Sequence, residues 1–64
     1  MMVVYMVRIR DVLNGRERWL ESPEGERFVS GDRRTADWAA LAMARRGTME
    51  LPYVVEVDPQ YERV

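Results

Sequence analysis

The sequence predicts an α+β domain in which a four-stranded mixed sheet carries one helix on one face. Three observations lead to this class: a β-branched opening stretch, an Asn-Gly pair between strand-like runs, and one alanine-rich run bounded by helix-start and helix-stop residues. The expected element order is β-β-β-α-β, and the expected strand order across the sheet is 3-2-1-4. We place a single domain over residues 1–58 and treat residues 59–64 as a loose tail.

The opening strand is expected over residues 3–13. Apolar side chains alternate along one face, namely Val3, Tyr5, Val7 and Ile9. The other face begins with Val4 and Met6 and continues with Arg8 and Arg10. Because the first half is apolar on both faces, this strand is predicted to lie in the centre of the sheet.

Asn14-Gly15 predicts a type I′ hairpin, because both central residues of that turn need positive φ. A two-residue turn would place Ile9 opposite Leu20 and Arg10 opposite Trp19. A second turn is expected at residues 22–25, which have Pro in the second place and Gly in the fourth. A third strand then follows over residues 26–30.

The helix is expected over residues 34–46, with Asp32 or Thr35 as N-cap and Gly47 as the C′ residue. The last strand is expected over residues 53–57, ended by Asp58-Pro59. A right-handed crossover would place this strand parallel to the first.

The predicted helix has no clean polar face. At 100° per residue, one apolar stripe contains Trp38, Leu41 and Ala42, and a nearly opposite stripe contains Ala36, Ala40, Met43 and Ala44. Two interpretations stay open: the outer stripe is alanine that tolerates water, or it packs on a second chain. Trp38 is expected in the core under the sheet.

Composition excludes several function classes. The 64 residues contain no Cys and no His, so disulfides, thiolate metal sites and the commonest general base are absent. We therefore expect no enzyme, no metal, no cofactor and no small-molecule substrate. Because so small a domain is marginally stable without such additions, a partner chain is the expected source of stability, and a homo-oligomer is predicted.

Ten basic residues and eleven acidic ones give a formal charge of −1, which is unlike a polybasic nucleic-acid binder. All the basic residues are arginine, which indicates a GC-rich genome. The start "MMVVYMV" is too short for a membrane span and lacks signal-peptide features, so a cytoplasmic protein is expected.

Two resemblances suggest functions. "VYMVRIRDVLNGRERWLES" followed by "TADWAALAMARR" resembles the arm-type (AP2-like) DNA-binding domain of tyrosine integrases over residues 4–46. That resemblance implies a three-stranded sheet followed by one helix, with DNA contacts from Arg8, Arg10, Arg16 and Arg18. The chain departs from the family in its acidic balance and its extra strand.

The arrangement strand–hairpin–strand–helix–"YVVEV" in a Lys-free chain is similar to uncharacterised small proteins of actinobacterial phages and mobile elements. This resemblance implies binding to a host protein. The leading hypothesis is therefore a phage-encoded, self-associating, non-enzymatic protein-binding module. Its candidate interface residues are Val4, Met6, Trp19, Ala36, Ala40 and Met43. The alternative is an accessory DNA-binding protein that uses the four arginines named above, although nucleic acid is disfavoured as a partner.

Overall fold

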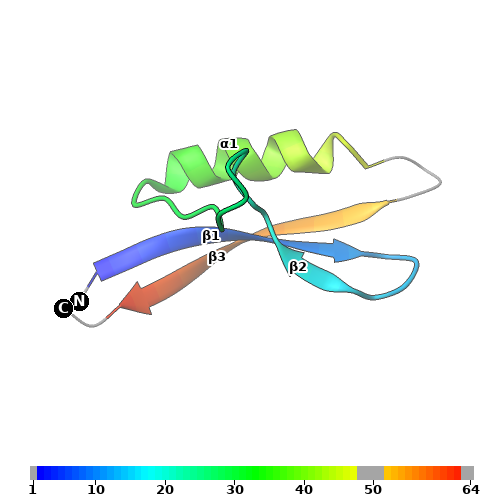
Figure 1. Cartoon of the computed structure of the whole chain (residues 1–64), viewed down its shortest axis with the longest axis horizontal. Helices are drawn as coiled ribbons and strands as arrows, with labels where there is room; N and C mark the ends of the chain where they lie inside the picture. Colours follow the sequence, from blue (N-terminus) through cyan, green and yellow to red (C-terminus); the bar gives the residue numbers. More distant parts are fainter. Residues whose placement is uncertain (1, 48–51, 63–64) are drawn as a thin grey trace.

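The computed structural model describes residues 2–47 and 52–62, which form one helix on one face of a three-stranded antiparallel sheet (Figure 1). The strands are β1 (Met2–Asp11), β2 (Glu17–Trp19) and β3 (Tyr53–Glu62), and the helix is α1 (Arg33–Ala44). The α+β class and the central position of β1 are confirmed. The described residues contain three strands rather than four, and the order β2-β1-β3 replaces the predicted order.

β3 runs antiparallel to β1 over ten residue pairs, from Met2 opposite Glu62 to Asp11 opposite Tyr53. The predicted crossover to a parallel strand is therefore wrong. The reason is the end of the sheet at which the helix begins. Ser30 pairs with Tyr5 near the start of β1, so α1 runs along the sheet toward the far end of β1, and the chain must return antiparallel.

The predicted third strand, residues 26–30, belongs to an irregular segment (residues 20–30) that we call the edge loop. The Phe28 amide donates to the Leu20 carbonyl at 2.8 Å, and the Tyr5 and Ser30 amides exchange bonds of 2.7 and 3.0 Å. Continuing the β2 register would place Ser22 opposite Tyr5, but Ser30 holds that place. Residues 22–29 therefore leave the sheet and form a projection, which includes the predicted turn at Gly25 (φ 86°).

The hairpin closes through a four-residue loop, residues 12–15, and not through a type I′ turn. The Asp11 amide donates to the Arg16 carbonyl at 2.9 Å, and Gly15 has φ 72° while no described non-glycine residue has positive φ. The Asp11 carboxylate accepts from the Leu13 amide, and Asn14 Oδ1 accepts from the Arg16 amide. These side-chain bonds favour the longer loop because they satisfy amides that the ladder leaves free.

This loop shifts the predicted register by two residues, so that Arg8 lies opposite Trp19 and Arg10 lies opposite Glu17. Because side chains alternate with a period of two, each residue keeps its predicted face and only its partner changes.

α1 begins at Arg33 with Asp32 as its N-cap, which confirms one of the two predicted caps. The Asp32 carboxylate accepts from the Arg34 amide at 3.0 Å and from the Thr35 hydroxyl at 3.2 Å. Gly47 follows the helix without positive φ, so the predicted left-handed cap is wrong. A Cβ at Gly47 would lie 3.1 Å from the Tyr53 amide nitrogen, so close packing accounts for this glycine.

The core lies between the sheet and the inner stripe of α1. Its members are Val7, Ile9, Ala36 and Met43, which are all buried. Trp38 is 70% exposed, so the prediction that it lies in the core is wrong. A helix on a single sheet buries one stripe, and the alanine-containing stripe allows the backbone of α1 to approach the strands more closely.

β3 continues past Asp58 and Pro59 to Glu62, so four residues assigned to a loose tail belong to the sheet. Residues 63–64 of that predicted tail lie outside the described part of the chain. Pro59 is tolerated because it stands opposite Tyr5, whose backbone groups bond to Ser30 on the other side of β1. The nitrogen of Pro59 therefore faces the outer edge, where no ladder bond is lost.

Candidate functional site

A groove runs between α1 and the edge loop. Its apolar part has a volume of about 430 Å³. Leu20, Pro23 and Phe28 line it from the edge loop, and Ala39, Ala42 and Met43 line it from the helix. Two alanine side chains of the helix lie opposite larger loop side chains, which leaves a hollow that the described residues do not fill.

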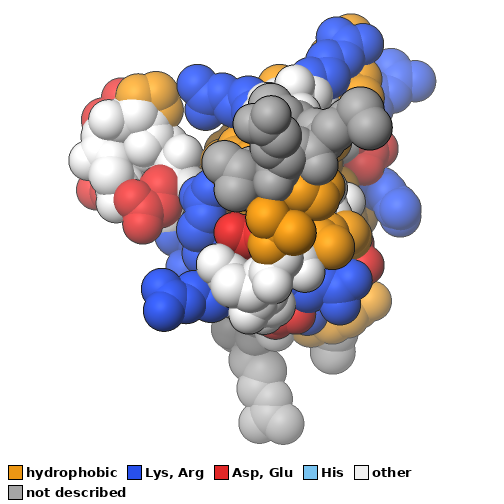
Figure 2. Space-filling view, turned by 90° about the vertical axis from the view of Figure 1, so that its right-hand side faces the viewer, with side chains coloured by type: hydrophobic (Ala, Val, Ile, Leu, Met, Phe, Trp, Pro, Cys, Tyr) orange, Lys and Arg blue, Asp and Glu red, His pale blue; other side chains and the backbone are white. Residues whose placement is uncertain are grey.

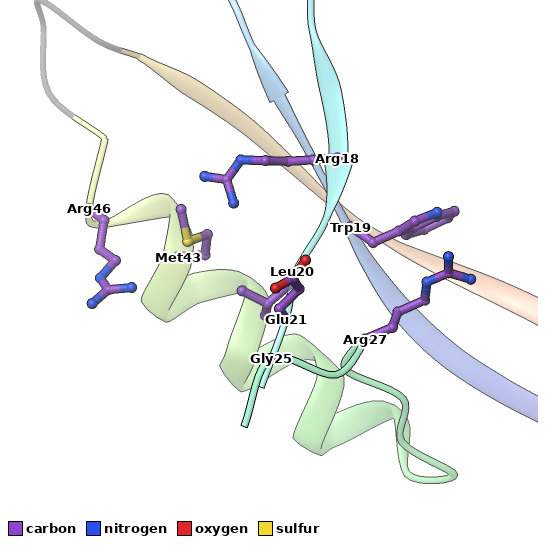
Figure 3. Close-up of a pocket in the computed structure, with 8 residues that line it drawn as sticks. All are labelled: Arg18, Trp19, Leu20, Glu21, Gly25, Arg27, Met43 and Arg46. Atoms are coloured by element: carbon purple, nitrogen blue, oxygen red, sulfur yellow. The ribbon is translucent and has the colours of Figure 1, made fainter. Parts of the chain in front are cut away.

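A second hollow of about 590 Å³ continues this groove at the end of α1 (Figure 3). The two hollows share Leu20, Glu21, Met43 and Arg46. In the second hollow, Arg18 lies on the same side of β2 as Met43, and Trp19 and Arg27 lie on the other side. The second hollow therefore extends around the edge of β2. We call the two hollows together the edge groove.

The basic end of the edge groove carries Arg18, Arg27 and Arg46 against one carboxylate, Glu21. None of these arginines forms an ion pair with a carboxylate in the described part of the chain. Arg18 stacks 5.9 Å from the Tyr53 ring centroid and Arg27 stacks 5.8 Å from that of Trp19. Figure 2 shows arginine side chains spread around the end of the molecule where α1 ends, with hydrophobic side chains gathered between them. This end is therefore suited to an anionic group.

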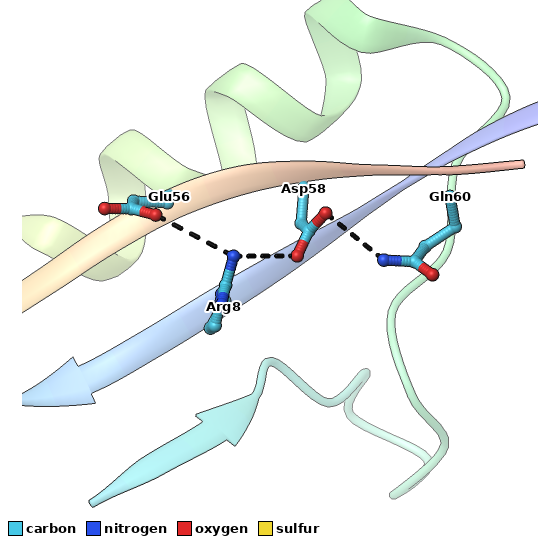
Figure 4. Close-up of polar contacts among 4 residues, drawn as sticks. All are labelled: Arg8, Glu56, Asp58 and Gln60. Carbon is cyan, nitrogen blue, oxygen red and sulfur yellow. Dashed lines mark hydrogen bonds and ion pairs between the residues drawn. The ribbon is translucent and has the colours of Figure 1, made fainter.

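The sheet face opposite α1 has a balanced charge. Arg8 lies between Asp58, at 2.8 Å, and Glu56, at 3.9 Å, and the Gln60 amide donates to Asp58 at 3.2 Å (Figure 4). The Arg8 guanidinium also lies 6.0 Å from the centroid of the Trp19 ring. These contacts hold Arg8 in place and neutralise its charge.

The four arginines expected to contact DNA do not share a surface. Arg8 and Arg10 lie on the open sheet face, Arg16 lies beside the hairpin loop, and Arg18 lies on the face that α1 covers. Three carboxylates, Glu17, Glu56 and Asp58, lie on the open face with Arg8 and Arg10. The integrase arm-type resemblance implies three strands before the helix, whereas among the described residues two strands precede α1 and one follows it.

The six candidate interface residues do not share one surface either. Met6, Ala36 and Met43 are buried inside the chain, at 6%, 0% and 7% exposed. Val4 is half-buried on the open sheet face and Ala40 is half-buried on α1. Trp19 and Met43 line the edge groove.

Sequence reasoning missed Leu20, Phe28 and Ala42 as groove residues. The reason is that the sequence predicts a third sheet strand over residues 26–30, whereas these residues lie outside the sheet strands. The excess of turn-forming residues between 22 and 25 was the one signal that the chain leaves the sheet there.

No protein-family model, curated protein or solved structure matches this chain. Over residues 2–47 and 52–62 there is no cluster of three or more His, Cys, Asp or Glu side chains that could hold a metal ion. In the same part of the chain, no helix has the length and hydrophobicity needed to cross a membrane.

The Arg8–Asp58 pair gives a first testable prediction. We expect Asp58→Ala to lower the free energy of unfolding by about 1 kcal/mol, because Arg8 is 39% exposed and solvent screens part of the interaction. Arg8→Met with Asp58→Ala is expected to cost less than the sum of the two single changes. Urea titrations of the three variants measure this coupling, and strictly additive costs would show that the pair contributes nothing.

Proposed function

We propose that the chain is a non-enzymatic protein-binding module whose edge groove receives an apolar segment of a partner protein with carboxylates beside it. The observation that carries this proposal is the continuity of the groove. Apolar side chains line one part, and three arginines without carboxylate partners among the described residues line the other.

The size and chemistry of the groove support a short peptide segment. Pockets of roughly 300–1,000 Å³ are typical of small-ligand sites, and each hollow lies in that range. An aromatic or aliphatic anchor would contact Leu20, Phe28 and Ala42. A carboxylate of the same segment would then reach Arg18 or Arg46, and arginine–carboxylate hydrogen bonds are stronger than neutral ones.

The charge distribution favours a protein partner over DNA. A DNA-binding sheet needs a positive face, whereas the open face of this sheet sets carboxylates beside Arg8 and Arg10. The basic end of the edge groove is too local to follow a phosphate backbone and lies beside an apolar hollow. A single apolar segment with acidic flanks matches both parts.

Selection from a random peptide display library against the purified chain tests this proposal. We expect enriched peptides to combine an aromatic or aliphatic residue with Asp or Glu. In fluorescence anisotropy with the best peptide, Arg46→Glu is expected to weaken binding by about tenfold or more, because it reverses a charge in the groove.

Arg45→Glu is the matched control for this variant. It makes the same charge change at the next residue, which is exposed but does not line either hollow. We expect Arg45→Glu to change the dissociation constant less than threefold. Equal weakening by the two variants, or selected peptides without acidic residues, would rule out the edge groove as the binding site.

A further inference from the structure

β3 presents a free backbone edge whose hydrogen-bonding pattern follows from its neighbours. In β1, the backbone groups of Tyr5, Val7 and Asp11 bond toward the edge loop and β2. The alternate residues of β1 therefore bond to β3. Their partners in β3 are Val54, Glu56, Asp58 and Gln60, so the groups of Tyr53, Val55, Val57, Pro59 and Tyr61 point outward.

This outer edge is long and regular. β3 has ten residues, and no described segment pairs with its outer side. An uncovered strand edge is a template for pairing with another strand, and proteins usually shorten, bulge or cover such edges. On β3, Pro59 removes one outward amide, whereas residues 53–57 keep every outward donor and acceptor.

We propose that this edge pairs antiparallel with the same edge of a second copy of the chain, about a two-fold axis through Val55. The two copies would then share one continuous six-stranded sheet. This inference does not depend on the edge groove, because none of residues 53–57 lines either hollow.

Two features of β3 favour Val55 over Val57 as the centre. Pairing about Val57 would set Glu56 opposite Asp58 twice and would place Pro59, which has no amide hydrogen, opposite Val55. Pairing about Val55 sets Val54 opposite Glu56 and Tyr53 opposite Val57. It brings no like charges together, and its aromatic–aliphatic pair is favourable.

The positions of the α1 helices in the two copies are compatible with this strand pairing. α1 contacts both β1 and β3, and an axis normal to the sheet would place both helices on one face. They would lie roughly two strand spacings apart, about 10 Å, which is close to the usual distance between packed helices. Because Ala39 and Ala42 face the edge groove, the opposite flank of α1 would meet the second helix, and that flank includes Ala40 and Ala44. Small side chains there permit close approach.

Solution mass by light scattering, measured over a concentration series, is the first test. We expect a concentration-dependent dimer for the unmodified chain. Val54→Glu is expected to weaken the dimer by about tenfold, because each new carboxylate would face Glu56 of the partner subunit. Val54→Lys is expected to strengthen it, with a gain that falls as salt is added.

Circular dichroism measures whether each Val54 variant is folded. A change in dimerisation can therefore be distinguished from a loss of folding in either variant. The chain has no cysteine, so Val54→Cys and Glu56→Cys proteins can also be mixed and oxidised. These positions would form a non-hydrogen-bonded pair with Cα atoms about 4.5 Å apart, which suits a disulfide. We expect the mixture to cross-link faster than either variant alone.

A monomer at all concentrations would overturn the inference. A dimer that responds equally to Val54→Glu and Val54→Lys, or that cross-links no faster in the mixture, would place the interface elsewhere and would also overturn it. Neither result would bear on peptide binding in the edge groove.

Discussion

Ile9→Ala is expected to lower the free energy of unfolding by about 2–5 kcal/mol. Ile9 is 1% exposed and lies on the face of β1 that α1 covers, so the truncated side chain leaves a cavity. A domain of this length has a total stability of roughly 3–10 kcal/mol, so this loss is a large fraction of the total. Urea denaturation followed by circular dichroism measures the loss.

Ile9→Val provides the graded control. It removes one methyl group at the same place and is expected to cost about 0.5–1.5 kcal/mol. Losses below 1 kcal/mol for Ile9→Ala would mean that this side chain does not hold the helix on the sheet.

The second large effect is expected for Ala36→Leu. Ala36 is fully buried on the stripe of α1 that faces the sheet, where a larger side chain has no space. Overpacking of this kind typically costs about 1–3 kcal/mol, because the helix must move away from the strands. Since the same stripe positions Met43 in the edge groove, peptide binding by this variant is expected to weaken as well.

Trp38→Ala is the informative comparison, because the sequence alone suggests that Trp38 is the core residue. It is 70% exposed, so its removal is expected to change the free energy of unfolding by less than about 0.5 kcal/mol. Thermal and urea unfolding of the two variants provide the comparison. A large loss for Trp38→Ala with none for Ala36→Leu would reverse the assigned orientation of α1.

The edge groove could be anticipated only in part from the sequence. Trp19 and Met43 line the groove, and their place in an interface stays a prediction. Leu20 and Phe28 were not expected there, because the groove exists only where residues 22–29 leave the sheet. Residues 22–29 leave the sheet because Tyr5 pairs with Ser30 and not with Ser22. Both serines are far from Tyr5 in the sequence, so no local pattern predicts which of them pairs with it.

Features that depend on neighbouring residues could be predicted from the sequence. Alternating apolar side chains predict β1 and its faces, Asp32 predicts the start of α1, and residues 22–25 predict a turn. These signals are local because side-chain period, capping and turn geometry involve only a few adjacent residues.

The direction of β3, the number of strands in the described residues and the buried stripe of α1 depend on contacts that form only in the folded chain. Both stripes of the helix are apolar, so hydrophobicity did not distinguish Trp38 from Ala36; the close approach of helix and sheet did. The direction of β3 followed from the end of the sheet at which α1 starts, which the Tyr5–Ser30 bonds fix. Such features depend on contacts between residues far apart in the chain, and local sequence patterns do not encode them.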